Sequence, residues 1–203
     1  MNYTIFDTPI LKTVMQWSSR LFFYATGWKA EGTRPDFKKY VLIAAPHTSN
    51  WDFVYTLLVA FILKIKIHMM AKQELLRPPF GPVLRWLGVI PIDRSKSNNT
   101  VANMIQAFDE HEELAMVIPP SGTRKKVMYW KSGFYHIARG ADVPIVMGYI
   151  DYRRKAGGLG PCIVPSGDIE TDMVRIRSFY RKVTAKYPEK SVEAPIVNIS
   201  LPR

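Results

Sequence analysis

Short apolar runs alternate with amphipathic segments along most of the chain. The run at 40–45 is uncharged and contains β-branched residues, as is typical of a strand buried on both faces. The segment 53–63 that follows it has the length and composition of a core helix. Extended along the chain, this pattern predicts strands near 28–31, 40–45, 66–71, 89–92, 114–118, 144–150 and 160–164. It predicts helices near 52–63, 80–86, 98–112, 133–140 and 171–186.

This order of elements predicts an α/β fold, a single domain whose mixed, mostly parallel sheet is flanked by helices. A length of 203 residues suits one domain with a sizeable core, and no linker or internal repeat divides the chain. In such sheets, ligands bind beyond the carboxyl ends of the strands. His47, Arg94 and Gly122 each follow a predicted strand directly. We therefore expect these residues to lie at one edge of the sheet.

Residues 1–27 are expected to form an N-terminal amphipathic helix that precedes a domain at 28–203. Thr8 suits the cap of this helix, Pro9 its first position and Gly27 its end. A helical wheel gathers an apolar arc from Ile10, Leu11, Val14, Met15, Trp17, Leu21, Phe22, Tyr24 and Ala25, with Lys12, Gln16, Ser19, Arg20 and Phe23 outside it. Such a helix either packs on its own domain or lies in a membrane interface. No segment has the ~20 apolar residues that cross a bilayer, and no cleavable signal is evident.

A histidine and an aspartate follow the first long strand, in the sequence PHTSNWD at 46–52. On one regular helix, residues five apart would point about 140° away from each other. His47 and Asp52 can therefore meet only if the chain turns between them, and Ser49 and Asn50 suit such a turn. In that case His47 can take a proton from a hydroxyl near neutral pH, while Asp52 fixes its tautomer. Alternatively, His47 is a loop residue beside an N-capping Asp52, and a covalent route through Ser49 stays open.

The chain carries 28 basic and 17 acidic residues, which gives a formal charge of +11. This excess favours an anionic partner such as a membrane lipid, a phosphorylated substrate or an acidic carrier protein. We discount nucleic acid because the basic residues are scattered and accompany no zinc-finger, RNP or helix-turn-helix pattern. Cys162 is the single cysteine, which excludes an intrachain disulfide and a multi-cysteine zinc site. The histidines other than His47 have no second ligand at a metal-binding spacing, so no metal site is expected.

Further sequence blocks accompany PHTSNWD in a fixed order. They read GVIPIDR at 88–94, PPSGTRKK at 119–126 and VPIV at 143–146. Together these blocks resemble the glycerolipid acyltransferase family, whose best-known members are 1-acylglycerol-3-phosphate acyltransferases. The resemblance covers residues 28–150, and agreement of several ordered blocks is far more specific than one motif.

The resemblance implies transfer of a fatty acyl group from acyl-CoA or acyl carrier protein to the hydroxyl of a lysophospholipid such as 1-acylglycerol-3-phosphate. It implies that His47 is the general base held by Asp52, with no cofactor beyond the thioester co-substrate. The residues that it assigns to the acceptor's phosphate or headgroup are Arg94, Ser121, Gly122, Thr123 and Arg124. Ser121 departs from the family pattern, which has glutamate before Gly-Thr-Arg. A serine carries no charge, so the acceptor's identity stays open, and an amino-lipid or another lysolipid is an alternative.

A lipid substrate favours the interfacial interpretation of the N-terminal helix, since Trp17 and the Phe22-Phe23 pair suit an anionic membrane surface. We expect a peripheral protein on the cytoplasmic side of a membrane, where acyl thioesters are found. The same site with water as the acceptor would be a thioesterase or lipid hydrolase. A basic lipid-binding module with an incidental histidine is a third hypothesis, which the ordered blocks disfavour.

Overall fold

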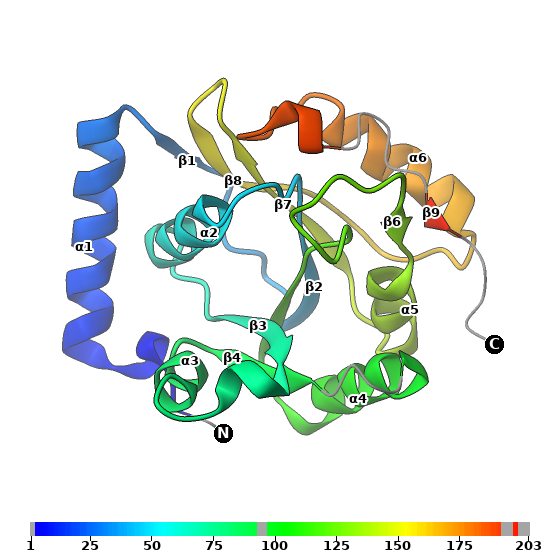
Figure 1. Cartoon of the computed structure of the whole chain (residues 1–203), viewed down its shortest axis with the longest axis horizontal. Coiled ribbons are helices and arrows are strands. Elements are labelled where there is room, and N and C mark those ends of the chain that lie inside the picture. The colour runs from blue at the N-terminus through cyan, green and yellow to red at the C-terminus, as the bar shows by residue number, and fades with distance from the viewer. Residues whose placement is uncertain (1–2, 93–96, 192–196, 199–203) are drawn as a thin grey trace.

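A seven-stranded sheet organises the computed structural model, which describes residues 3–92, 97–191 and 197–198 (Figure 1). Its strand order is β1-β8-β7-β2-β5-β3-β4. Every neighbouring pair is parallel except β7 and β8, which confirms the predicted mixed, mostly parallel sheet. The strands are β1 (Lys29–Glu31), β2 (Lys39–Ala44), β3 (Ile67–Lys72), β4 (Val89–Ile92), β5 (Leu114–Ile118), β7 (Ile145–Asp151) and β8 (Ala156–Ile163).

Helices cover both faces of this sheet, as the sequence predicts (Figure 1). Residues of β2 alternate between two cores: Val41 and Ile43 pack with α4, α5 and α6, whereas Tyr40 and Leu42 pack on the side of α1 and α2. The helices are α1 (Pro9–Thr26), α2 (Trp51–Ile62), α3 (Gly81–Trp86), α4 (Ser97–Glu110), α5 (Gly133–Gly140) and α6 (Ile169–Tyr180). The 3-10 turns are η1 (Ile5–Asp7), η2 (Gln73–Leu76) and η3 (Pro188–Lys190).

The predicted last helix is too long, because α6 ends at Tyr180 and not near residue 186. Beyond it the chain turns back, and the Thr184 carbonyl accepts a hydrogen bond of 3.0 Å from the backbone N–H of Tyr152. The Tyr180 hydroxyl is buried and donates to the Gly148 carbonyl at 2.9 Å. These contacts dock the segment after α6 against the end of β7.

Three strands were also not predicted correctly. A small parallel pair, β6 (Trp130–Lys131) with β9 (Val197–Asn198), is too short to leave a periodic pattern in the sequence. Strand β8 begins at Ala156, earlier than predicted, because its glycines weaken the strand pattern. Gly158 is required there, since a Cβ at this position would overlap the Glu31 carbonyl of the neighbouring strand.

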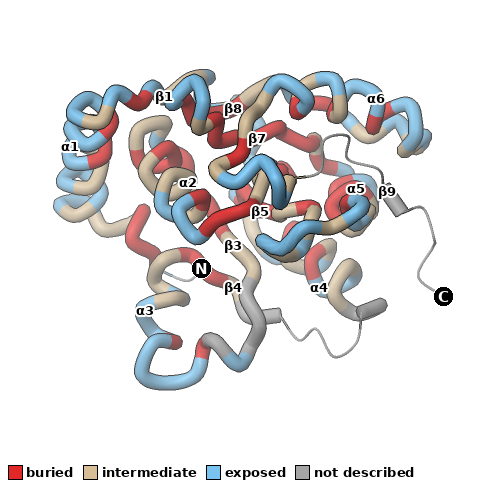
Figure 2. Tube along the Cα trace, turned by 45° about the horizontal axis from the view of Figure 1, so that its top comes forward, coloured by how far each residue is buried: buried red, intermediate tan, exposed pale blue. Residues whose placement is uncertain are grey.

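Helix α1 begins at Pro9, as predicted, and Gly27 ends it in the left-handed conformation with φ +72°. It is shorter than the expected segment 1–27, because residues 5–7 form the separate turn η1. The predicted apolar arc divides in two. Leu11 and Met15 pack on the core, together with Phe23 and the buried Ser19, which the wheel placed on the polar side. Phe22 is 37% exposed, and its ring lies 6.1 Å from the Tyr55 ring of α2. The remaining residues of the arc face outward, on the exposed side of α1 in Figure 2. Within the described residues, no helix combines the length and apolar character needed to span a bilayer.

Candidate active site

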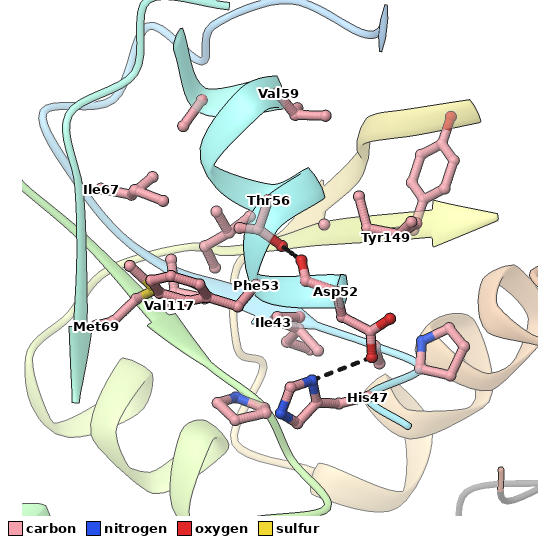
Figure 3. A pocket seen from close by; sticks show the side chains of 18 of the residues that line it. Ile43, His47, Asp52, Phe53, Thr56, Val59, Ile67, Met69, Val117 and Tyr149 are labelled. Atoms are coloured by element: carbon pink, nitrogen blue, oxygen red, sulfur yellow. Dashed lines mark hydrogen bonds and ion pairs between the residues drawn. The ribbon is translucent and has the colours of Figure 1, made fainter. Parts of the chain in front are cut away.

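The loop between β2 and α2 brings His47 and Asp52 together at the carboxyl edge of the sheet. Helix α2 begins at Trp51, so Asp52 lies in its first turn while the preceding loop folds back over it. The Nδ1 atom of His47 lies 3.3 Å from Oδ2 of Asp52 (Figure 3). The same carboxylate oxygen accepts the backbone N–H groups of Thr48 at 2.7 Å and Ser49 at 2.9 Å. The Asp52 carboxylate itself therefore stabilises the turn that brings it next to His47.

Tyr152 also holds this carboxylate, a contact that the sequence did not predict. Its hydroxyl donates to Oδ1 of Asp52 at 2.8 Å. The ring packs edge-on against Trp28 and Tyr55, at centroid distances of 5.3 and 5.7 Å. Tyr152 follows β7, which pairs with β2, so the loops after both strands are neighbours. The one indication of this contact in the sequence is that Tyr152 lies just beyond the predicted strand at 144–150 and so near the edge where His47 was expected.

These contacts determine the ionisation of Asp52. Burial of the carboxyl would raise its pKa, but hydrogen bonds from His47, the Ser49 N–H, Tyr152 and the Thr48 N–H outweigh burial and hold the pKa below its usual value. Asp52 is therefore an acceptor only, and Nδ1 of His47 must carry the proton that they share. In the neutral imidazole, the other ring nitrogen, Nε2, then has the free lone pair. The side chain of His47 is 19% exposed, so a substrate can reach it.

A cavity of about 590 Å³ opens beside this pair. One face of α2 lines it along its length, with Asp52, Phe53, Thr56, Val59 and Ala60 at helical spacing (Figure 3). Apolar side chains from the sheet form the opposite wall, among them Ile67, Met69 and Val117. The Thr56 hydroxyl donates to the Asp52 carbonyl at 2.7 Å, so its polar atom is already satisfied. The cavity is therefore largely apolar and becomes polar near His47.

The predicted phosphate-binding block forms the turn after β5. Gly122 has φ +66°, where a residue with a Cβ would be strained, and its N–H donates to the Pro119 carbonyl at 3.0 Å. Gly122, Thr123 and Arg124 line the same cavity as His47 and Asp52. Ser121 does not line this cavity but a neighbouring one. Its hydroxyl donates to the Thr123 carbonyl at 2.8 Å. Arg94 lies outside the described residues.

Among the described residues, no other histidine pairs with a carboxylate as His47 does. Burial lowers the pKa of His68 to about 4, so this histidine stays neutral within the sheet. Within the ranges that the structure describes, no group of three or more histidine, cysteine, aspartate or glutamate residues could hold a metal ion.

The Tyr152→Phe variant tests the hydrogen bond to Asp52. We expect a loss of about 1.5–3 kcal/mol in the free energy of unfolding at neutral pH, because the bond is made to an ionised group. Since the pKa of Asp52 is lower in the folded protein than the unfolded value of 3.8, this stabilisation is fully present above that pH. It is lost as the pH falls through the folded pKa, so the difference between wild type and variant should shrink below about pH 4.

Urea unfolding at a series of pH values measures this difference. Tyr55→Phe is the matched control, because Tyr55 belongs to the same aromatic cluster and makes no side-chain hydrogen bond within the described part of the chain. Equal losses in both variants, or a loss in Tyr152→Phe that does not depend on pH, would contradict the assignment.

Comparisons with known proteins agree with this architecture. The crystal structure of PlsC, the 1-acyl-sn-glycerophosphate (LPA) acyltransferase of Thermotoga maritima, is similar with a TM-score of 0.59. The similarity covers 85% of this chain and 77% of that one at 16% sequence identity, and therefore concerns the fold. No curated protein sequence matches the chain. The family model described as Acyltransferase matches residues 29–150, which is more than half of the chain and includes His47, Asp52 and the turn after β5. The chain therefore belongs to the acyltransferase family.

Proposed function

We propose that this protein transfers a fatty acyl group from a thioester donor, acyl-CoA or acyl carrier protein, to the hydroxyl of a lysophospholipid. One observation carries the proposal: a carboxylate-bound histidine lies at the polar end of a largely apolar cavity that Arg124 also lines. Such a site suits an acyl chain, a hydroxyl and a phosphate together. The acceptor named for the similar Thermotoga protein, 1-acyl-sn-glycerophosphate, is the first one to test here.

The proposed reaction uses His47 twice. Nε2 takes the proton of the acceptor hydroxyl while the oxygen attacks the thioester carbonyl carbon, which forms a tetrahedral oxyanion. Asp52 stabilises the imidazolium produced in this step. When the oxyanion collapses, the carbon–sulfur bond breaks, and the imidazolium returns its proton to the thiolate leaving group. The products are an ester and a free thiol, and no enzyme nucleophile is needed.

The apolar part of the cavity is proposed to hold the donor's acyl chain. Each buried methylene contributes roughly 0.8 kcal/mol to binding. Val59 and Ala60 lie about 11–12 Å along α2 from Asp52, at 1.5 Å per residue, so the apolar lining extends well beyond the reacting group. The chain can therefore extend along α2 while its carbonyl lies beside His47.

Helix α1 is proposed to bind the cytoplasmic face of a membrane, where thioester donors are available. Its outward residues form a narrow stripe at helical spacing opposite the face that packs on the domain: Ile10, Val14, Trp17, Leu21 and Tyr24, each more than half exposed. Arg20 lies 5.6 Å from the Trp17 ring and supplies a cation beside this stripe. Apolar side chains flanked by positive charge suit an anionic lipid surface.

His47→Ala tests the catalytic base. We expect it to lower the turnover number roughly 10²–10⁴-fold, as is usual when a general base is removed, with an unchanged circular dichroism spectrum. The assay follows thiol release from an acyl thioester with and without lysophosphatidate, and mass spectrometry identifies the lipid product. His136→Ala is the control, because His136 lies on α5 and lines neither cavity. Near-full activity in folded His47→Ala would overturn the mechanism, and free fatty acid as the only product would indicate a hydrolase.

Arg124→Ala tests the phosphate contact. We expect the apparent KM for lysophosphatidate to rise at least tenfold while the KM for the donor changes little, because the guanidinium can grip a phosphate through two parallel hydrogen bonds. Steady-state kinetics with each substrate varied in turn measures both constants. Lys126→Ala serves as the control, since Lys126 is an exposed cation of the same turn that does not line the cavity. Equal effects of the two substitutions would mean that only net charge matters.

The double variant Trp17→Ser/Leu21→Ser tests the membrane contact. We expect at least a tenfold loss of binding to phosphatidylglycerol vesicles, since burying one leucine-sized side chain is worth roughly 1.5–3 kcal/mol. The melting temperature should not change, because these side chains are 65% and 67% exposed. Val164→Ser/Val174→Ser is the matched control, with exposures of 70% and 63% away from α1. Vesicle co-sedimentation that is equal for wild type and both variants would refute the contact.

A further inference from the structure

A second cavity, of about 250 Å³, lies on the other side of the catalytic histidine. Pro46 and His47 line both cavities, so these residues form part of the wall between them. A group that reacts at His47 can therefore extend into either cavity. The first is largely apolar and suits a hydrocarbon chain. The character of the second determines what else the site can bind.

The second cavity is polar and basic. The segment that follows α6 contributes Arg181 and Lys190, and Thr48 and Ser121 add hydroxyl groups from the loops after β2 and β5. Its lining, as far as the structure describes the chain, contains no aspartate or glutamate. Neither cation forms an ion pair with any described carboxylate. Two positive charges without a described counter-ion, beside the Thr48 hydroxyl, are suited to a multiply charged anion.

We propose that this cavity is a phosphate-binding subsite, in which Arg181 and Lys190 bind a phosphate group of one of the two substrates. The proposal rests on the proposed function, because acyl-CoA, acyl carrier protein and a lysophospholipid acceptor all carry a phosphate. Arg124 lines the other cavity, so the two phosphates can be bound by separate cations on either side of His47. The subsite then orients the reacting group toward the imidazole.

The two cations are held differently, which makes them separable in an experiment. Arg181 directly follows the last residue of α6, where a cation also complements the helix dipole. Lys190 lies in η3, and its ammonium is 4.5 Å from the centre of the Tyr187 ring. A purely structural role for Arg181 would change the melting temperature of the protein and leave ligand affinity unaltered.

Calorimetric titration at about 0.15 M salt, where long-range charge effects are screened, tests the subsite without requiring turnover. The probes are sn-glycerol 3-phosphate, for the acceptor, and coenzyme A, for the donor. Glycerol and pantetheine are their phosphate-free counterparts. We expect the wild type to bind one phosphorylated probe and not its counterpart, and that probe identifies the source of the phosphate. Arg181→Ala and Lys190→Ala should each weaken its binding roughly ten- to a hundredfold, as for loss of a hydrogen bond to a charged group.

Two further variants sharpen the test. Ser121→Glu adds a carboxylate to the cavity wall and should weaken the same probe at least tenfold by repulsion. Lys182→Ala removes an exposed cation next to Arg181 that does not line the cavity, and should change the dissociation constant less than twofold.

The outcomes separate this inference from the proposed function. Absence of wild-type binding to both phosphorylated probes overturns the subsite, whether or not acyl transfer is observed. So does equal weakening by Lys182→Ala, or unchanged affinity in both Arg181→Ala and Lys190→Ala. Specific binding without acyl transfer by the wild type leaves the subsite standing and removes the proposed function.

Discussion

The buried carboxylate of Asp52 is the group on which the site depends. Its oxygens accept hydrogen bonds from the Thr48 and Ser49 backbone, from Tyr152 and from His47. An ionised carboxylate in this position would be costly without such partners, so the loop, the strand end and the imidazole must assemble together. The contacts that stabilise the charge thus also orient the histidine.

Local pattern was sufficient for the scaffold and for part of the site. The buried strand β2 and the core helix after it could be predicted because the length and composition of each apolar run are set by adjacent residues. The spacing of His47 and Asp52 indicated only that they could meet if the chain turned between them, and the structure has that turn. Because Gly122 follows a predicted strand of a mostly parallel sheet, the sequence also predicted that the turn after β5 would lie at the same edge as His47.

Contacts between distant segments could not be predicted in the same way. Tyr152 lies 100 residues beyond Asp52 and reaches it because β7 pairs with β2. The sequence pattern predicted that the last helix continues past Tyr180, because the following residues have good helical propensity. In the structure, tertiary packing turns the chain back after Tyr180, so that Arg181 and Lys190 line the second cavity. On α1, the helical wheel separated apolar from polar residues but could not show which side packs on the domain. Phe23 and Ser19 lie outside the apolar arc of the wheel, yet both are buried against the domain.

An aromatic cluster joins α1 to the candidate active site through direct packing. Phe23 of α1 packs on Trp28 and Tyr55, at centroid distances of 6.0 and 6.1 Å. Trp28 and Tyr55 stack on each other, and both contact Tyr152, whose hydroxyl holds Asp52. Large, closely packed rings leave little freedom for one element to move without the other. If the outer stripe of α1 binds a lipid surface as proposed, this packing holds the proposed base His47 and its partner Asp52 in one defined orientation relative to that surface.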